Sequence, residues 1–162
     1  MNLIIDRNLF DVERWKILRD KGWVGMTSDE RSEWLGELPT TPNASKGMYT
    51  HNDLNRVESA VEVIVGRLIE AGFLTRPLVV KTDWSYGDVL TKEDMSRYLS
   101  NIATLRTKAV VYPNTPIAPN VNRTFNYNAA NDIEKILSDI DDWLNHKSES
   151  STYVGDIFLG EV

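Results

Sequence analysis

Histidine and aspartate are the residue types in this sequence that could support catalysis or bind a metal ion. The chain has 162 residues with two histidines and no cysteine, which excludes disulfides, thiolate metal sites and a cysteine nucleophile. His51 and His146 lie in different predicted elements, and neither has a serine–carboxylate partner in a recognisable catalytic signature. We therefore expect both histidines to face solvent, and we expect no catalytic residue and no enzymatic activity.

The densest acidic cluster consists of Asp139, Asp141 and Asp142. Asp139 and Asp142 are three residues apart and share one face of a predicted helix, where they could hold a divalent cation. Metal sites usually need more convergent oxygens than one helix supplies, so a solvated acidic face is the preferred interpretation. The chain also lacks a glycine-rich phosphate loop, a zinc motif and a nucleophile elbow. No metal ligand and no cofactor are predicted.

Aromatic and acidic residues alternate in the turn-rich segment 81–88. Asp83 and Asp88 flank Trp84 and Tyr86, a composition found in carbohydrate-binding loops. The preferred interpretation is structural, with a buried tryptophan that anchors the loop.

The element that must position these residues is a central helix predicted over residues 52–71. Asn52 can act as its N-cap, and Gly72 stands just past the last turn, where a left-handed residue ends a helix. Gly66, inside the helix, indicates close approach of another helix. Apolar residues recur at spacings of three and four, which places them on one face: Leu54, Val57, Val61, Ile64 and Leu68.

The whole pattern predicts a mainly α fold, a small helical bundle with a short extended C-terminal tail. The prolines among residues 112–126 forbid a helix there and predict an irregular crossover. Helices are predicted over residues 11–21, 28–35, 52–71, 92–108 and 129–146. The predicted common core consists of Val57, Val61, Ile64, Leu68, Leu99, Ile102, Ile133, Ile136, Ile140 and Trp143.

The two chain ends are apolar, although the helices already offer continuous apolar faces to one another. We expect residues 1–146 to form the helical domain, with residues 1–10 as a short strand or an arm on a partner. Residues 147–162 are predicted to be a polar linker and an extended, strand-like tail. The alternative is that the tail folds back onto its own domain. The candidate interface residues are Leu3, Ile4, Ile5, Phe10, Tyr153, Ile157 and Phe158.

The string Asp–apolar–x–basic–apolar occurs near the start of four predicted helices. It begins at Asp11, Asp53, Asp94 and Asp132. The aspartate suits the positive end of the helix dipole, and the basic residue three positions later is its neighbour on the helix surface. We interpret the pattern as four similar helix starts. The alternative is an array of helical repeats with a period of about 40 residues.

Charge and hydropathy limit the classes of partner. The formal net charge is −6, so the chain lacks the positive surface that displaces counterions from nucleic acid. The longest apolar run is a few residues, and we expect no membrane insertion. Hydrophobic residues make up 41% and charged residues 26%, as in an ordinary globular domain.

Several short strings occur in order along nearly the whole chain, at residues 11–14, 21–23, 26–35, 53–58, 81–84, 95–99, 130–137 and 155–161. Each string is weak alone, but together they resemble a family of small proteins from phages and prophages of Gram-positive bacteria. Residues 37–46 look longer than the usual pattern of this family.

Members of this family are encoded among tail and tail-fibre genes, and the Asn-Arg-Val-Glu string at 55–58 recurs in longer tail-fibre proteins. The resemblance implies a virion structural role, in the tail or tail fibre, through protein–protein contacts. It implies other virion proteins and further copies of the chain as partners, with assembly in the host cytoplasm, and it carries over no catalytic residue. The alternative is a phage accessory protein that binds and inhibits a host factor.

Overall fold

The computed structural model describes residues 1–122 and 124–157, and for residues 148–157 it describes the backbone alone. Helix α3 (His51–Glu70) is the central element. The Asp53 carboxylate accepts hydrogen bonds from the backbone N–H and the hydroxyl of Thr50 at 2.8 and 2.9 Å. The N-cap is therefore Thr50, and the prediction of Asn52 was wrong by two residues. Gly72 ends the helix with a φ of 78°, as predicted.

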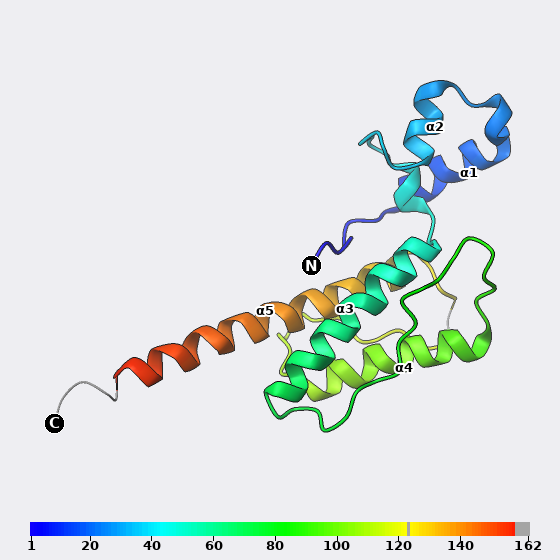
Figure 1. Ribbon diagram of the computed structural model, residues 1–162. Coiled ribbons are helices and arrows are strands. Elements are labelled where there is room, and N and C mark those ends of the chain that lie inside the picture. Colours follow the sequence, from blue (N-terminus) through cyan, green and yellow to red (C-terminus); the bar gives the residue numbers. More distant parts are fainter. Residues whose placement is uncertain (123, 158–162) are drawn as a thin grey trace.

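Helices α3, α4 (Lys92–Lys108) and α5 (Tyr127–Ile157) pack on one another as a three-helix bundle (Figure 1). Thr91 caps α4, and its hydroxyl is 2.6 Å from the Asp94 carboxylate. All the predicted core residues are buried except Trp143. Trp143 is partly buried, and its ring packs edge-on against Phe73 at a centroid distance of 5.1 Å.

Helices α1 (Leu9–Gly25) and α2 (Ser28–Trp34) and the 3₁₀ turn η1 (Ala44–Gly47) form a small lobe at one end of the bundle (Figure 1). The lobe has its own apolar core, formed by Leu18, Met26 and Ala44 with Trp15 and Trp34 packed against them.

Gly47 and Gly22 of the lobe each have a structural role, whereas Gly66 of α3 has no close neighbour. A Cβ on Gly47 would lie 2.1 Å from the carbonyl oxygen of Asp11, so η1 can approach α1 only without a side chain at this position. Gly22 kinks α1 with a φ of 69°, and the helix continues to Gly25, beyond the predicted end at residue 21. A Cβ on Gly66 would have no neighbour within 4 Å, so the predicted helix approach at Gly66 is wrong.

The prediction of a mainly α bundle with a tail that reaches beyond it is confirmed, and the described residues contain no strand. The α5 backbone stays helical to Ile157 and extends past the bundle (Figure 1). Within residues 147–157 the backbone is thus helical, not the predicted linker and strand, and residues 158–162 lie outside the described residues. In the described chain, no helix has the length and apolar character needed to cross a membrane.

The core assignment predicts a large stability difference between two adjacent residues of α3. Ile64 is fully buried, whereas Val63 is 53% exposed. Replacing Ile64 with alanine should lower the free energy of unfolding by about 2–5 kcal/mol, through lost burial and a residual cavity. Val63→Ala should change it by less than about 0.5 kcal/mol. Urea unfolding measures both, and similar losses for the two variants would show that the buried face is assigned wrongly.

Candidate protein-interaction site

The N-terminal segment is held on the bundle by a buried arginine. Arg7 is 4% exposed, and its guanidinium donates to the carboxylates of Asp53 on α3 and Glu134 on α5 at 2.9 and 2.8 Å. The same guanidinium donates to the carbonyl oxygen of Ile4 at 2.7 Å. The backbone of Arg7 also pairs in both directions with the side chain of Asn131. Residues 1–8 therefore lie against their own domain.

A second arginine completes this group. Arg56 donates to Asp53 at 2.6 Å and to Glu134 at 2.8 Å, so two guanidinium groups share two carboxylates. Burial alone would raise the pKa of Asp53. The hydrogen bonds from the Thr50 backbone and from Arg56, with the charge of Arg7, outweigh burial and hold this pKa below its usual value. We call Arg7, Asp53, Arg56 and Glu134 the charge cluster.

The structure separates the predicted interface residues of the N-terminus into two kinds. Leu3 is partly buried and packs on the bundle core, and Ile4, also partly buried, donates its backbone N–H to Glu134 at 2.5 Å. Ile5 and Phe10 are 49% and 68% exposed and remain available to a partner. The side chains of Tyr153 and Ile157, and all of Phe158, lie outside the described residues.

A buried carboxylate outside the charge cluster positions the connector between α3 and α4. Glu58 is 1% exposed and accepts from both terminal nitrogens of Arg97, from the indole N–H of Trp84 at 3.1 Å and from the backbone N–H of Lys81 at 2.8 Å. The side chain of Asn55 pairs with the backbone of Trp84 in both directions, at 2.8 Å each.

The anchoring role predicted for Trp84 is confirmed, because its side chain is buried and both of its backbone polar groups are bonded. A buried indole cannot stack on a sugar, so the carbohydrate-loop alternative fails for Trp84. Tyr86, at the tip of the connector, is 95% exposed.

The three clustered acidic residues of α5, Asp139, Asp141 and Asp142, each have a partner from the protein. Asp139 is 4% exposed and accepts from the Thr115 hydroxyl at 2.6 Å, so it is not part of a solvated face as predicted. Asp141 pairs with Arg67, and Asp142 accepts from the Tyr112 hydroxyl. No group of three or more His, Cys, Asp and Glu residues is placed to hold a metal ion within the described part of the chain.

The two histidines lie apart. His146 is exposed, and its ring nitrogen Nδ1 is 2.8 Å from the carbonyl oxygen of Asp142. His51 is only partly buried, with its ring beside that of Tyr86 at a centroid distance of 6.5 Å. The expectation of a solvent-facing residue therefore holds fully for His146 and in part for His51.

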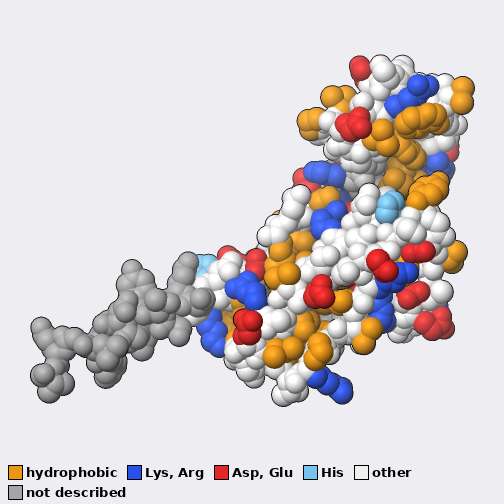
Figure 2. Space-filling view, in the orientation of Figure 1, with side chains coloured by type: hydrophobic (Ala, Val, Ile, Leu, Met, Phe, Trp, Pro, Cys, Tyr) orange, Lys and Arg blue, Asp and Glu red, His pale blue; other side chains and the backbone are white. Residues whose placement is uncertain are grey.

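The lobe exposes large apolar side chains, and Figure 2 shows apolar atoms over much of its visible face. Phe10 and Ile17 are seven residues apart on α1, which places them on the same side of the helix, and they are 68% and 57% exposed. Other exposed apolar residues of the lobe are Trp23, Val24 and Leu35. We call these five residues the lobe surface.

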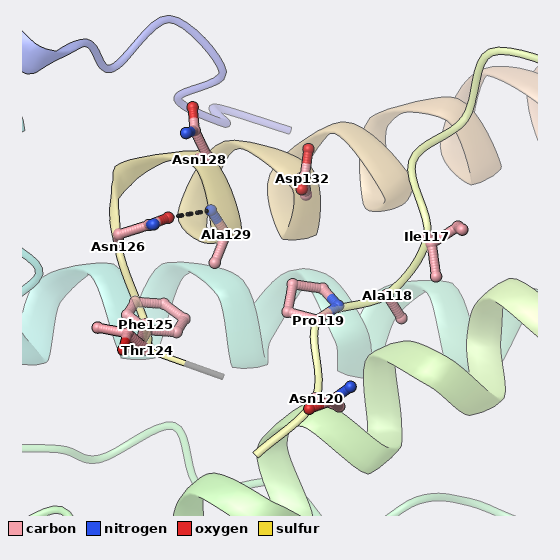
Figure 3. A pocket seen from close by; sticks show the side chains of 10 residues that line it. All are labelled: Ile117, Ala118, Pro119, Asn120, Thr124, Phe125, Asn126, Asn128, Ala129 and Asp132. Carbon is pink, nitrogen blue, oxygen red and sulfur yellow. Dashed lines mark hydrogen bonds between the residues drawn. The ribbon is translucent and has the colours of Figure 1, made fainter. Parts of the chain in front are cut away.

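A separate pocket of about 450 Å³ lies where the crossover before α5 meets the first turns of that helix. Figure 3 shows Phe125 and Ile117 on opposite sides, Pro119 between them, and Asp132 across from Pro119 on α5. Burial raises the pKa of Asp132. No pattern in the sequence predicts this pocket.

The repeated string at the helix starts has a role beyond dipole matching. Three of its four basic residues bind a buried glutamate on another helix: Arg14 binds Glu33, Arg56 binds Glu134 and Arg97 binds Glu58. The fourth, Lys135, pairs with Asp139 one turn along its own helix. The interpretation as similar helix starts was therefore incomplete. The recurring basic residue was the one available signal for the buried glutamates.

Comparison of the chain with protein-family models, with curated proteins and with solved structures gave no match.

The charge cluster predicts that Glu134→Gln is strongly destabilising, because Arg7 and Arg56 would then keep only Asp53 as a charged partner. The expected loss is about 3–5 kcal/mol in the free energy of unfolding. The matched control is Asp20→Asn, which breaks the exposed pair with Arg19 and should cost less than about 1 kcal/mol. A loss for Glu134→Gln no larger than the control, in urea unfolding, would contradict the role of the cluster.

Two buried carboxylates predict how stability depends on pH. The hydrogen bonds from Arg14 hold the pKa of Glu33 below its usual value, and the pKa of Asp53 is also lowered. The stability from these groups is fully present above their unfolded-state pKa values of about 4, and it is lost as the pH falls through the lower folded values. The urea midpoint should therefore fall steadily below about pH 4. A midpoint that stays constant or rises on acidification would contradict this prediction.

Proposed function

We propose that the protein is a virion structural protein, associated with the tail or tail fibre, that acts through protein–protein contacts. The observation that carries this proposal is the lobe surface, together with the resemblance described above. Phe10, Ile17 and Val24 are each more than half exposed, although they belong to a lobe with an apolar core of its own. Aromatic residues are enriched in the cores of protein interfaces, and removing exposed apolar groups from water at an interface favours binding.

The architecture supports two sites of contact on one chain. The lobe stands at one end of the bundle, and α5 extends beyond the opposite end (Figure 1). A chain with contact sites at opposite ends can join copies or neighbours head to tail, as assembly into a particle requires. We therefore propose further copies of the chain and other virion proteins as partners, and we keep Tyr153, Ile157 and Phe158 as predicted contact residues.

The proposal predicts that the chain is found in purified particles of a phage that encodes it, by mass spectrometry. Replacing Phe10 and Ile17 together with serine should lower its amount in particles at least about tenfold, because the interface loses its apolar anchors. The lobe core is untouched, so circular dichroism and urea unfolding should be unchanged. Val79→Ser is the control, because Val79 is 73% exposed but lies on the connector after α3.

Particles that lack the wild-type chain would overturn the proposal. If the chain were instead recovered from infected cells in complex with a host protein, the accessory-inhibitor alternative would replace it. Equal incorporation of the double variant and the wild type would show that the lobe surface is not the contact site.

A further inference from the structure

Asp132 is a partly buried carboxylate whose protein partners are missing among the described residues. It is located on α5 at the edge of the pocket beneath the crossover (Figure 3). The neighbouring charged residues of the helix are engaged elsewhere, because Glu134 binds Arg7 and Arg56 and Lys135 pairs with Asp139. Burial raises the pKa of Asp132. Among the described residues, no positively charged group forms an ion pair with this carboxylate.

The rest of the pocket combines apolar side chains with a few neutral polar ones. The side-chain carbonyl of Asn126 accepts from the backbone N–H of Ala129 at 3.0 Å, and that of Asn120 accepts from the backbone of Asn122 at 3.1 Å. Thr124 and Asn128 add a hydroxyl and an amide, so Asp132 is the one charged residue among the described residues of the lining. The apolar lining is formed by Ile117, Ala118, Pro119, Phe125 and Ala129.

The one carboxylate and the apolar part of the lining favour one ligand chemistry. A carboxylate beside apolar side chains matches a molecule with one cationic head and a hydrocarbon stem. The pocket volume of about 450 Å³ falls within the usual range of small-molecule sites, about 300–1,000 Å³, so it can hold such a stem. Charge-assisted hydrogen bonds from an ammonium group to a carboxylate are about twice as strong as neutral ones.

We propose that this pocket binds a primary alkylammonium group, with the ammonium at Asp132 and the methylene chain along Phe125 and Pro119. A lysine side chain of a partner protein and a free alkylamine both carry this group. The site goes beyond the virion role proposed above and does not depend on it.

Chemical-shift titration of the ¹⁵N-labelled protein with three probes tests the proposal. The probes are pentylamine, Nα-acetyl-lysine methylamide and the uncharged analogue 1-pentanol. Both amines should cause saturable shifts of backbone amides within residues 117–132, whereas 1-pentanol should bind at least about tenfold more weakly, because it lacks the charge. Tighter binding of the lysine derivative than of pentylamine would identify a protein lysine as the source, and the reverse order would identify a free amine.

Two variants with the same change of charge locate the site. Asp132→Asn should weaken binding of both amines at least about tenfold. It should not lower the urea midpoint, because it breaks no ion pair. Asp83→Asn removes an exposed carboxylate from the connector after α3 and should leave binding unchanged. Equal binding of 1-pentanol and the amines, unaltered binding by Asp132→Asn, or the absence of saturable shifts would each overturn the proposal.

Discussion

The charge cluster of Arg7, Asp53, Arg56 and Glu134 is the constraint on which the arrangement of the chain depends. It joins the N-terminal segment, α3 and α5, which are distant in sequence, through four bonds of 2.6–2.9 Å. Removing these charges from water is costly, and the cost is offset only when every member has its partners. The interdigitated apolar faces resist displacement, and the cluster adds directional bonds that require the observed alignment of the two helices. It therefore fixes how α5 lies along α3 and where the N-terminus is held.

Much of the bundle could be predicted from apolar spacing, because spacings of three and four identify the buried face of a helix. Ile64, Ile102 and Ile136 are all fully buried, as that spacing requires. Helix ends were less certain. Several capping side chains lie close together before α3, and sequence alone did not distinguish Thr50 from Asn52. Thr27 and Glu30 before α2 have the specific spacing of a capping box, and both of its hydrogen bonds are formed.

The buried charges, the exposed apolar residues and the pocket were harder to predict, for three physical reasons. A charged residue on a helix is normally exposed, so Glu58 and Glu134 carry no local sign that arginines from other elements bury them. An apolar residue near a chain end is covered by whatever surface lies nearby. Leu3 packs on the bundle core, whereas Phe10 is exposed, and composition does not distinguish the two cases. The pocket at Asp132 depends on a crossover whose path no periodic pattern specifies.

The position of Glu134 in the sequence has a consequence for biosynthesis. The residues of the lobe core all lie within the first 44 positions, so a ribosome completes that unit early, and nearby contacts of this kind form quickly. Glu134, by contrast, is added late. Until α5 emerges, Arg7 and Arg56 have only Asp53 as an acidic partner, and the exposed apolar face of α3 lacks the α5 residues that cover it. The nascent chain therefore carries a finished lobe on an unfinished bundle, and α5, which follows α3 and α4 in the chain, supplies the second carboxylate of the charge cluster.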